Sequence, residues 1–204
     1  GEKEKEEYVK MLVDEIRNCP DTVQNYRVIS IFFGGGTPSL LTGEQIGRLM
    51  DTVREIFTLD EDAEITMEMN PGTVTEEKLR KYRQAGVNRL SIGLQSVNDE
   101  ELRLLGRIHT YEEFLEAYHL ARANGFANIN VDLISAIPGQ TVESWRRTLE
   151  QVMALFPEHI SAYSLILEEG TTFYKKYVED EAKEGPKLPD EDAERQMYWD
   201  TETL

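Results

Sequence analysis

The sequence predicts an α/β fold in which parallel strands alternate with helices. Strand-like apolar stretches and amphipathic helical stretches alternate at intervals of roughly 30 residues, the length of a β/α unit. Polar residues stand at or just past the carboxyl ends of five successive strand-like stretches: Gly34–Thr37, Glu68, Gln95, Asp132 and Ser164. Because such ends converge at one mouth of a barrel but spread along the edge of an open sheet, we favour a β/α barrel over a doubly wound sheet.

Five strands are expected. Each is a short apolar stretch that is followed by glycine, proline or a polar residue, which are residues that favour turns. Alternation with helices makes parallel pairing through right-handed crossovers the expected topology. The expected strands are residues 27–33, 64–69, 88–94, 128–135 and 160–167.

Helices are expected between the strands, where apolar residues recur three and four positions apart. Their ends carry local signals: Pro20 closes the first, Thr42 and Thr75 are N-caps, and Gly86 and Gly125 end two others. The expected helices are residues 8–18, 43–57, 75–85, 99–105, 111–124 and 142–156, followed by a helical tail from about residue 172.

The composition indicates one globular core with a strong acidic excess. The 204 residues suffice for one buried core, and they carry a net charge of −17. Nucleic acid is therefore not an expected partner, since phosphate binding needs a basic face. No stretch reaches the roughly 18 apolar residues of a membrane span and no signal peptide precedes the first helix, so a cytoplasmic location is expected and membrane association is not indicated.

The thiol and imidazole groups do not suggest catalysis. Cys19 is the single cysteine, which excludes an intramolecular disulfide and a multi-thiolate metal site within this sequence. We expect Cys19 to be half-buried at a helix end. The three histidines, His109, His119 and His159, are expected to pack or to lie at the surface. Without a nucleophile–base pair, hydrolysis and acyl transfer have no support.

Three consecutive glycines, Gly34 to Gly36, follow the first expected strand. Such a run costs backbone entropy and adds nothing to strand packing. It suits a backbone that approaches a polar ligand closely, with N–H groups free to bind it. A flexible turn between a strand and a helix is the other interpretation, and the run alone does not decide between them.

The strand-end residues, together with one nearby arginine, match a zwitterionic nucleoside. The two carboxylates can accept hydrogen bonds from ribose hydroxyls or from an ammonium, and the arginine suits a carboxylate. The glycine backbone and its threonine can hold an amino-acid-like head or a phosphate, but a phosphate fits less well because the carboxylates would repel it. The candidate ligands are Gly35, Gly36, Thr37, Glu68, Gln95, Arg107 and Asp132.

Several motifs, in order, resemble one known family over most of the chain. The family is the radical S-adenosylmethionine family of oxygen-independent coproporphyrinogen III oxidases, and two later stretches resemble its haem-chaperone (HemW-type) branch more closely. The motifs of the wider family are Phe33–Pro38, Glu68–Thr73, Arg89–Ser96, Leu105–Arg107 and Val131–Ile134. The stretches of the haem-chaperone branch are Ile137–Thr141 and Ala162–Leu165.

The resemblance implies a partial six-stranded β/α barrel that binds S-adenosylmethionine and a [4Fe–4S] cluster, with haem as a further ligand. It implies that Gly35, Gly36 and Thr37 line the methionine end, where Glu68 also binds. The same comparison places the remaining candidates, Gln95, Arg107 and Asp132, in the nucleoside pocket. The leading hypothesis is a haem chaperone that delivers haem to acceptor proteins. The alternatives are a coproporphyrinogen III oxidase and, in another class, a nucleotide-binding domain without radical chemistry.

The chain departs from the family pattern in its thiols. Members hold their cluster through a Cys-x-x-x-Cys-x-x-Cys loop after the first barrel strand, and this sequence shows neither that loop nor that strand. We therefore expect residues 1–204 to be a core fragment that is inactive in radical chemistry as written, with the tail from about residue 172 leading toward a missing C-terminal domain. Whether the whole protein is an enzyme stays open at this point.

Overall fold

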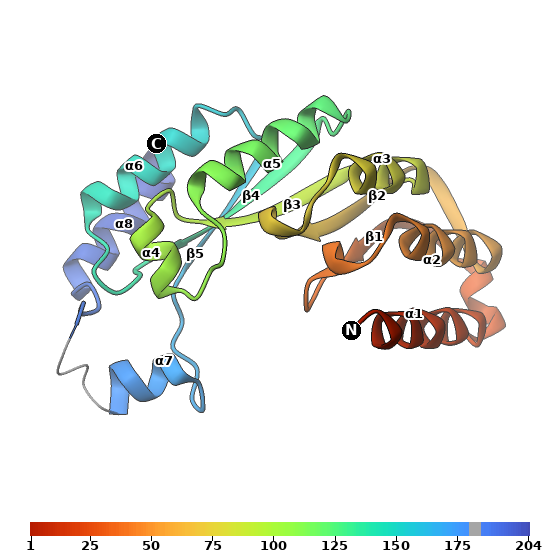
Figure 1. Ribbon diagram of the computed structural model, residues 1–204, viewed down its shortest axis with the longest axis horizontal. Coiled ribbons are helices and arrows are strands. Elements are labelled where there is room, and N and C mark those ends of the chain that lie inside the picture. The colour runs from red at the N-terminus through yellow and green to blue at the C-terminus, as the bar shows by residue number, and fades with distance from the viewer. Residues whose placement is uncertain (180–184) are drawn as a thin grey trace. The chain divides into compact units, whose positions relative to one another are not determined.

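The computed structural model describes residues 1–179 and 185–204. Five strands are present in these ranges: β1 (Arg27–Phe33), β2 (Thr58–Met69), β3 (Arg89–Gln95), β4 (Asn128–Ser135) and β5 (His159–Ser164). They belong to one sheet in the order β1-β2-β3-β4-β5 (Figure 1). β1 with β2, β2 with β3 and β4 with β5 pair in parallel, as the alternation of strands and helices predicts.

The helices lie between and after the strands. They are α1 (Glu2–Arg17), α2 (Gly43–Ile56), α3 (Glu76–Ala85), α4 (Asp99–Leu104), α5 (Tyr111–Ala123), α6 (Val142–Met153), α7 (Thr172–Tyr174) and α8 (Glu191–Thr203). Short 3-10 turns cover Asp21–Asn25, Pro38–Leu40 and Pro71–Thr73, and a π-helical turn covers Lys175–Glu179. Within the described ranges, none of these helices is long and apolar enough to cross a membrane.

The chain divides into two compact units. The first unit comprises Gly1–Ile92 and Glu116–Ile129, and the second comprises Gly93–Leu115 and Asn130–Leu204. Strands β3 and β4 and helix α5 each contribute residues to both units.

Apolar residues at helical spacing build the core of the first unit. Ile46 and Met50 on α2 are completely buried, as are Leu79 on α3 and Met67 on β2. Helix α2 contacts both α1 and α3, and Val9 of α1 is also completely buried. Removing such side chains from water is the main stabilising contribution to this packing.

The predicted helix caps of the first unit are confirmed. Thr42 accepts a hydrogen bond from the Gln45 amide, and the Gln45 side chain accepts one from the Thr42 amide, a reciprocal capping box at the start of α2. Thr75 accepts from the Lys78 amide at the start of α3. Gly86 ends α3 with a φ of 109°, a conformation that favours glycine.

In the second unit the tail helix α8 packs on α6. Trp145 is completely buried, and its indole nitrogen donates to the Met197 carbonyl at 3.0 Å and to Thr201 at 3.1 Å. The guanidinium of Arg146 forms two hydrogen bonds with Asp200, at 2.6 and 3.0 Å. Residues 180–184 of the predicted helical tail lie outside the described residues.

The predicted first residues of one helix and one strand are wrong, because both elements begin with charged residues that show no apolar periodicity. Helix α1 begins at Glu2 rather than residue 8, since its first turns hold strong helix formers and ion pairs such as that between Lys5 and Glu2 instead of apolar residues. Strand β2 begins at Thr58 rather than residue 64. Its first half is mostly exposed and acidic, so periodicity does not reveal it.

The predicted last residues of one strand and one helix are also wrong. Apolar residues extend the sequence pattern past both ends, but in the structure these residues are not buried. Strand β5 ends at Ser164 rather than residue 167, and Ile166 is 78% exposed. Helix α6 ends at Met153 rather than residue 156. Phe156 is 83% exposed and has a φ of 53°, which a helix cannot contain.

Candidate functional site

The glycine run after β1 meets two different steric demands. A Cβ on Gly34 would lie 2.5 and 2.8 Å from ring atoms of Phe32 and 3.2 Å from Oε1 of Glu68. Gly35 and Gly36 have φ values of 72° and 55°, in the left-handed region, and their Cβ positions face open space. The absence of a side chain at Gly34 therefore lets the Phe32 ring and the Glu68 carboxylate lie close to its backbone. Gly35 and Gly36 allow a left-handed backbone conformation that other residues adopt only with conformational strain.

Glu68, at the carboxyl end of β2, is held against this run. Its Oε2 accepts a hydrogen bond from the Gly35 amide at 3.1 Å. The side chain is only half-buried, so its carboxylate keeps lone pairs that a further donor can reach. Thr37 is also half-buried and precedes the 3-10 turn that Pro38 begins. Together these groups offer a carboxylate, a hydroxyl and exposed glycine backbone.

In the second unit, Gln95 ends β3 in an unusual conformation. Its φ is 78° although it is not glycine, and its side chain is 6% exposed. Nε2 of Gln95 lies 3.0 Å from where a Cβ on Gly93 would stand, so a side chain at position 93 would crowd it. The preceding carbonyl, of Leu94, lies 3.3 Å from Nε2 of the buried His109. His109 thus packs against the strand end, as predicted.

Arg107 and Asp132 interact electrostatically in the same unit. Burial lowers the pKa of the Arg107 guanidinium, and the negative charge of Asp132 opposes that shift. Oδ1 of Asp132 accepts a hydrogen bond from Nδ2 of Asn130 at 2.7 Å. Asn130, which is 2% exposed, in turn uses its Oδ1 to accept from Ser161 at 3.0 Å and to contact Nδ1 of His159.

The seven predicted ligands are divided between the two units: Gly35, Gly36, Thr37 and Glu68 lie in the first, and Gln95, Arg107 and Asp132 lie in the second. In the first unit the structure brings Gly35 and Glu68 into contact, with Gly36 and Thr37 next along the chain. In the second it brings Arg107 near Asp132. Ser164, the fifth strand-end position, instead donates to Glu194 of α8 and so holds the tail helix.

Sequence reasoning missed two buried polar residues of the second unit, Asn130 beside Asp132 and Glu101 on α4. Asn130 shares one strand face with Asp132, because residues two apart in a strand point to the same side. That spacing was a usable signal. Glu101 accepts hydrogen bonds from Ser96, Gln140 and Ser144. Its position three residues after Asn98, the N-cap of α4, predicts a capping role but not these distant partners.

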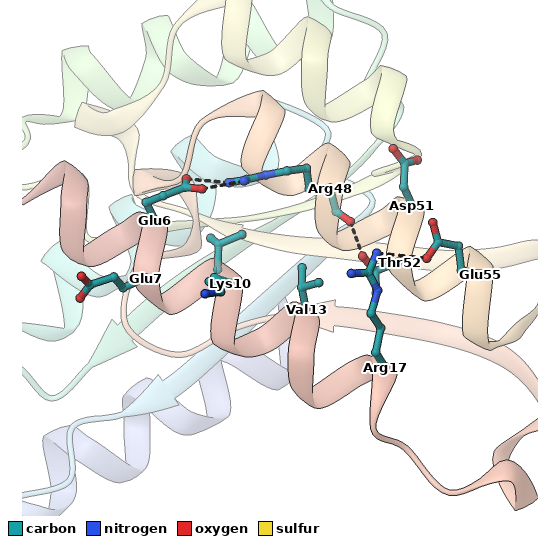
Figure 2. A pocket seen from close by; sticks show the side chains of 10 residues that line it. Glu6, Glu7, Lys10, Val13, Arg17, Arg48, Asp51, Thr52 and Glu55 are labelled. Carbon is teal, nitrogen blue, oxygen red and sulfur yellow. Dashed lines mark hydrogen bonds and ion pairs between the residues drawn. The ribbon is translucent and has the colours of Figure 1, made fainter.

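A cavity of about 470 Å³ lies between α1 and α2, and none of the predicted ligands lines it (Figure 2). Two ion pairs join the helices across it. Glu6 forms two 2.6 Å hydrogen bonds with Arg48, and Arg17 lies 3.4 Å from Glu55. Because these four charges already neutralise each other, they do not form a converging set of groups for a ligand.

The residues of this chain do not fit an iron–sulfur cluster. Such a cluster needs at least three thiolates, and Cys19 is the single cysteine. Cys19 is half-buried at the end of α1, as predicted, with its Sγ 3.8 Å from the Glu15 carbonyl. No group of three His, Cys, Asp or Glu side chains among the described residues could hold a metal ion.

Known proteins resemble this chain in sequence and in fold. The haem chaperone HemW of Escherichia coli is 42% identical over 200 residues, which are 98% of this chain and 50% of that protein. HemZ of Bacillus subtilis, an oxygen-independent coproporphyrinogen-III oxidase-like protein, is 41% identical over 141 residues, 68% of this chain and 28% of that protein. The structure of coproporphyrinogen III oxidase, HemN, from Escherichia coli superposes with a TM-score of 0.83 at 31% identity, covering 97% of this chain and 44% of that one.

These similarities confirm the predicted fold class, part of a radical S-adenosylmethionine β/α barrel. The chain spans about half the length of the HemW proteins it matches. The model of the Radical SAM superfamily matches residues 2–152, which are most of the chain. The chain therefore belongs to the Radical SAM superfamily, and its sequence fits the haem-chaperone HemW branch.

Proposed function

We propose that this chain is a core part of a haem chaperone that binds S-adenosylmethionine, binds haem and delivers the haem to acceptor proteins. The observation that carries the first step is the contact between the Glu68 carboxylate and the Gly35 amide at the mouth of neighbouring strands. The haem step is supported by the HemW relatives, which are 36% to 42% identical to this chain in Escherichia coli, Haemophilus influenzae and Bacillus subtilis.

Each set of candidate ligands, taken within its own unit, offers groups that suit one part of S-adenosylmethionine. In the first unit, Glu68 can accept from the ammonium of the methionine moiety, while Thr37 and the glycine backbone bind beside it. In the second unit, Asp132 can accept from ribose hydroxyls, and Gln95 can both donate and accept. Arg107 belongs to the same proposed nucleoside pocket, where its guanidinium can donate to ligand oxygens. S-adenosylmethionine would supply a radical only after one-electron reduction by a cluster that these residues do not hold, so this chain's residues contribute binding and orientation.

Any [4Fe–4S] cluster of the natural protein would be held by cysteines outside this sequence. A single thiol, that of Cys19, cannot replace three thiolates. The candidate ligands thus support a proposal of S-adenosylmethionine binding and give no basis for a redox step by this chain.

Oxidation of coproporphyrinogen III, with two propionates decarboxylated to vinyl groups, is the second candidate function. It is favoured by the TM-score of 0.83 with HemN over 97% of this chain. The two functions share the S-adenosylmethionine site, so they differ in the porphyrin chemistry alone.

The S-adenosylmethionine site is tested by calorimetric titration of the natural protein with this ligand. We expect the Glu68→Gln and Asp132→Ala variants to weaken binding by about tenfold or more, since each loses a charge-assisted hydrogen bond. Glu61→Gln is the matched control, because Glu61 is exposed on the same strand as Glu68. Unchanged affinity in both site variants would contradict the assignment and favour a nucleotide-binding domain without radical chemistry.

The choice between chaperone and oxidase is tested with hemin and with coproporphyrinogen III on the natural protein under anaerobic conditions. A saturable Soret-band titration with hemin, followed by its transfer to a haem-free acceptor, supports the chaperone. Vinyl products from coproporphyrinogen, without saturable hemin binding, would overturn it and establish the oxidase.

A further inference from the structure

Lys78, on the first turn of α3, reaches two loops that follow different strands. Its ammonium donates to the Ser39 carbonyl at 2.9 Å, in the segment after the glycine run. It also donates to the Thr73 carbonyl at 3.1 Å, in the turn that follows Glu68 and the end of β2. The side chain is half-buried, so water competes weakly for these bonds.

A ring of hydrogen bonds joins the same two loops beside the Lys78 ammonium. The Asn70 amide donates to the Ser39 hydroxyl at 3.1 Å, and the Thr73 hydroxyl donates to the Asn70 carbonyl at 2.8 Å. Because the Thr73 proton is thus used, Ser39 donates to Thr73 across their 2.6 Å contact. Ser39 is completely buried. The two loops therefore meet through directional bonds and not only through packing.

Two further side chains bind the carbonyls next to that of Ser39. The Tyr82 hydroxyl, on α3, donates to the Leu41 carbonyl at 2.6 Å, and burial raises the pKa of this phenol. The half-buried Lys5, on α1, donates to the Leu40 carbonyl at 3.2 Å. Three consecutive carbonyls are thus fixed by side chains. Lys78 alone of these three donors also reaches the loop after β2, through the Thr73 carbonyl.

We propose that Lys78 is a positioning residue: by tying the loop after β1 to the loop after β2, it maintains the 3.1 Å contact between the Gly35 amide and the Glu68 carboxylate. The proposal rests on the proposed function in one respect, namely that this contact belongs to the S-adenosylmethionine site. Lys78 itself touches no ligand in this account. Its role is to limit the positions that the two exposed glycines, Gly35 and Gly36, can take relative to the carboxylate.

The test measures backbone amide exchange of the ligand-free protein by NMR. In Lys78→Met, the Ser39 and Thr73 carbonyls lose their shared donor, so we expect the Gly35 amide to exchange about tenfold faster. The amide of Val131, in the second unit, should exchange as in the wild type and so reports that the protein is folded. Arg80→Met is the matched control, because Arg80 is an exposed cation on the same helix.

Chemical rescue separates positioning by the amine from loss of side-chain bulk. In the 204-residue chain, a Lys78→Cys variant in a Cys19→Ser background carries one thiol, and aminoethylation of that thiol returns an ammonium to the position of the Lys78 amine. We expect this treatment to restore slow exchange at Gly35, and Lys78→Arg to restore part of it. A change of less than twofold in Lys78→Met, or fast exchange that aminoethylation leaves in place, would overturn the proposal. Because no ligand is present, failure of S-adenosylmethionine binding would overturn the proposed function alone.

Discussion

The two units present their candidate ligands in opposite ways. In the first unit the groups are mostly backbone: the exposed Gly35 and Gly36 stand beside one half-buried carboxylate, that of Glu68. In the second unit they are side chains, and one of them, Asp132, accepts a hydrogen bond from the buried Asn130. The first group therefore depends on backbone conformation, and the second depends on the satisfaction of buried hydrogen bonds.

This difference determines how much a substitution in each group lowers the free energy of unfolding. A substitution at a left-handed glycine adds conformational strain, typically about 1 kcal/mol, because the surroundings stay open. Removal of a buried hydrogen-bond partner leaves donors or acceptors that water cannot reach, which costs about 1–3 kcal/mol for each group. Substitutions in the second unit should therefore reduce the free energy of unfolding more than those in the first.

The largest expected effect is at Glu101 of the second unit, which is 6% exposed. Its carboxylate accepts from Ser96 at 2.6 Å, from Gln140 at 2.9 Å and from Ser144 at 2.5 Å. In Glu101→Leu the side-chain volume is roughly kept, but three buried donors lose their acceptor. We expect the free energy of unfolding to fall by about 3 kcal/mol or more, measured by urea denaturation.

Glu100→Leu is the control for this variant, since Glu100 is an exposed neighbour on α4. Its effect should stay within about 0.5 kcal/mol. A loss below about 1 kcal/mol in Glu101→Leu would show that the three donors find other acceptors. Buried hydrogen bonds of the second unit would then contribute no more to stability than backbone conformation contributes in the first.

The next effect compares two glycines of the first unit. Gly35→Ala places a Cβ on a residue with a φ of 72° and should lower the free energy of unfolding by about 1 kcal/mol. Gly47→Ala, in the interior of α2 where a Cβ meets nothing within 4 Å, should raise it by about 0.5–1 kcal/mol.

Opposite signs for these two alanine variants would show that backbone conformation, and not space, limits the glycine run. Urea denaturation of both proteins measures this directly. If both variants were stabilised, the left-handed conformation of Gly35 would carry no cost, and the run would be a flexible turn after all.

The sequence predicted the alternation of strands and helices well, because that alternation follows from periodicity and from local caps such as Thr42 and Gly86. Candidate ligands such as Gly35 and Glu68 could be named because they stand at strand ends, and Asp132 lies three residues before the end of β4. Of their contacts, the structure shows that between Gly35 and Glu68. The predicted boundaries of helices and strands were wrong where an element contains polar residues that break the apolar pattern, as in the acidic first half of β2.

The supporting contacts could not be predicted, because they join residues far apart in sequence. Lys78 and Ser39 are 39 positions apart, and Glu101 and Ser144 are 43 positions apart. Neither pair leaves a local pattern, since a lysine on a first helical turn or a glutamate near an N-cap is ordinary on its own. Such partners follow from tertiary packing, which single-sequence patterns do not contain.

The smallest expected effect concerns an exposed ion pair of the first unit. Arg48 forms two hydrogen bonds with Glu6 and, with help from Gln45, lowers the pKa of that carboxyl from 4.5 to about 2. Since the folded pKa is the lower one, the stabilisation is complete above pH 4.5 and is lost as the pH falls toward 2. We expect Glu6→Gln to be slightly less stable than the wild type at pH 7, and the gap to close near pH 2.

Denaturation midpoints measured from pH 7 to pH 2, at low and at high salt, check this last expectation. The pair is exposed, so high salt should shrink the gap at pH 7 as well. Glu7→Gln is the control, because Glu7 faces the same cavity but lies 4.0 Å from its partner Lys3. A gap at pH 7 as large as that of Glu101→Leu would mean that surface charge stabilises the first unit as strongly as buried hydrogen bonds stabilise the second, and the difference between the two units would not hold.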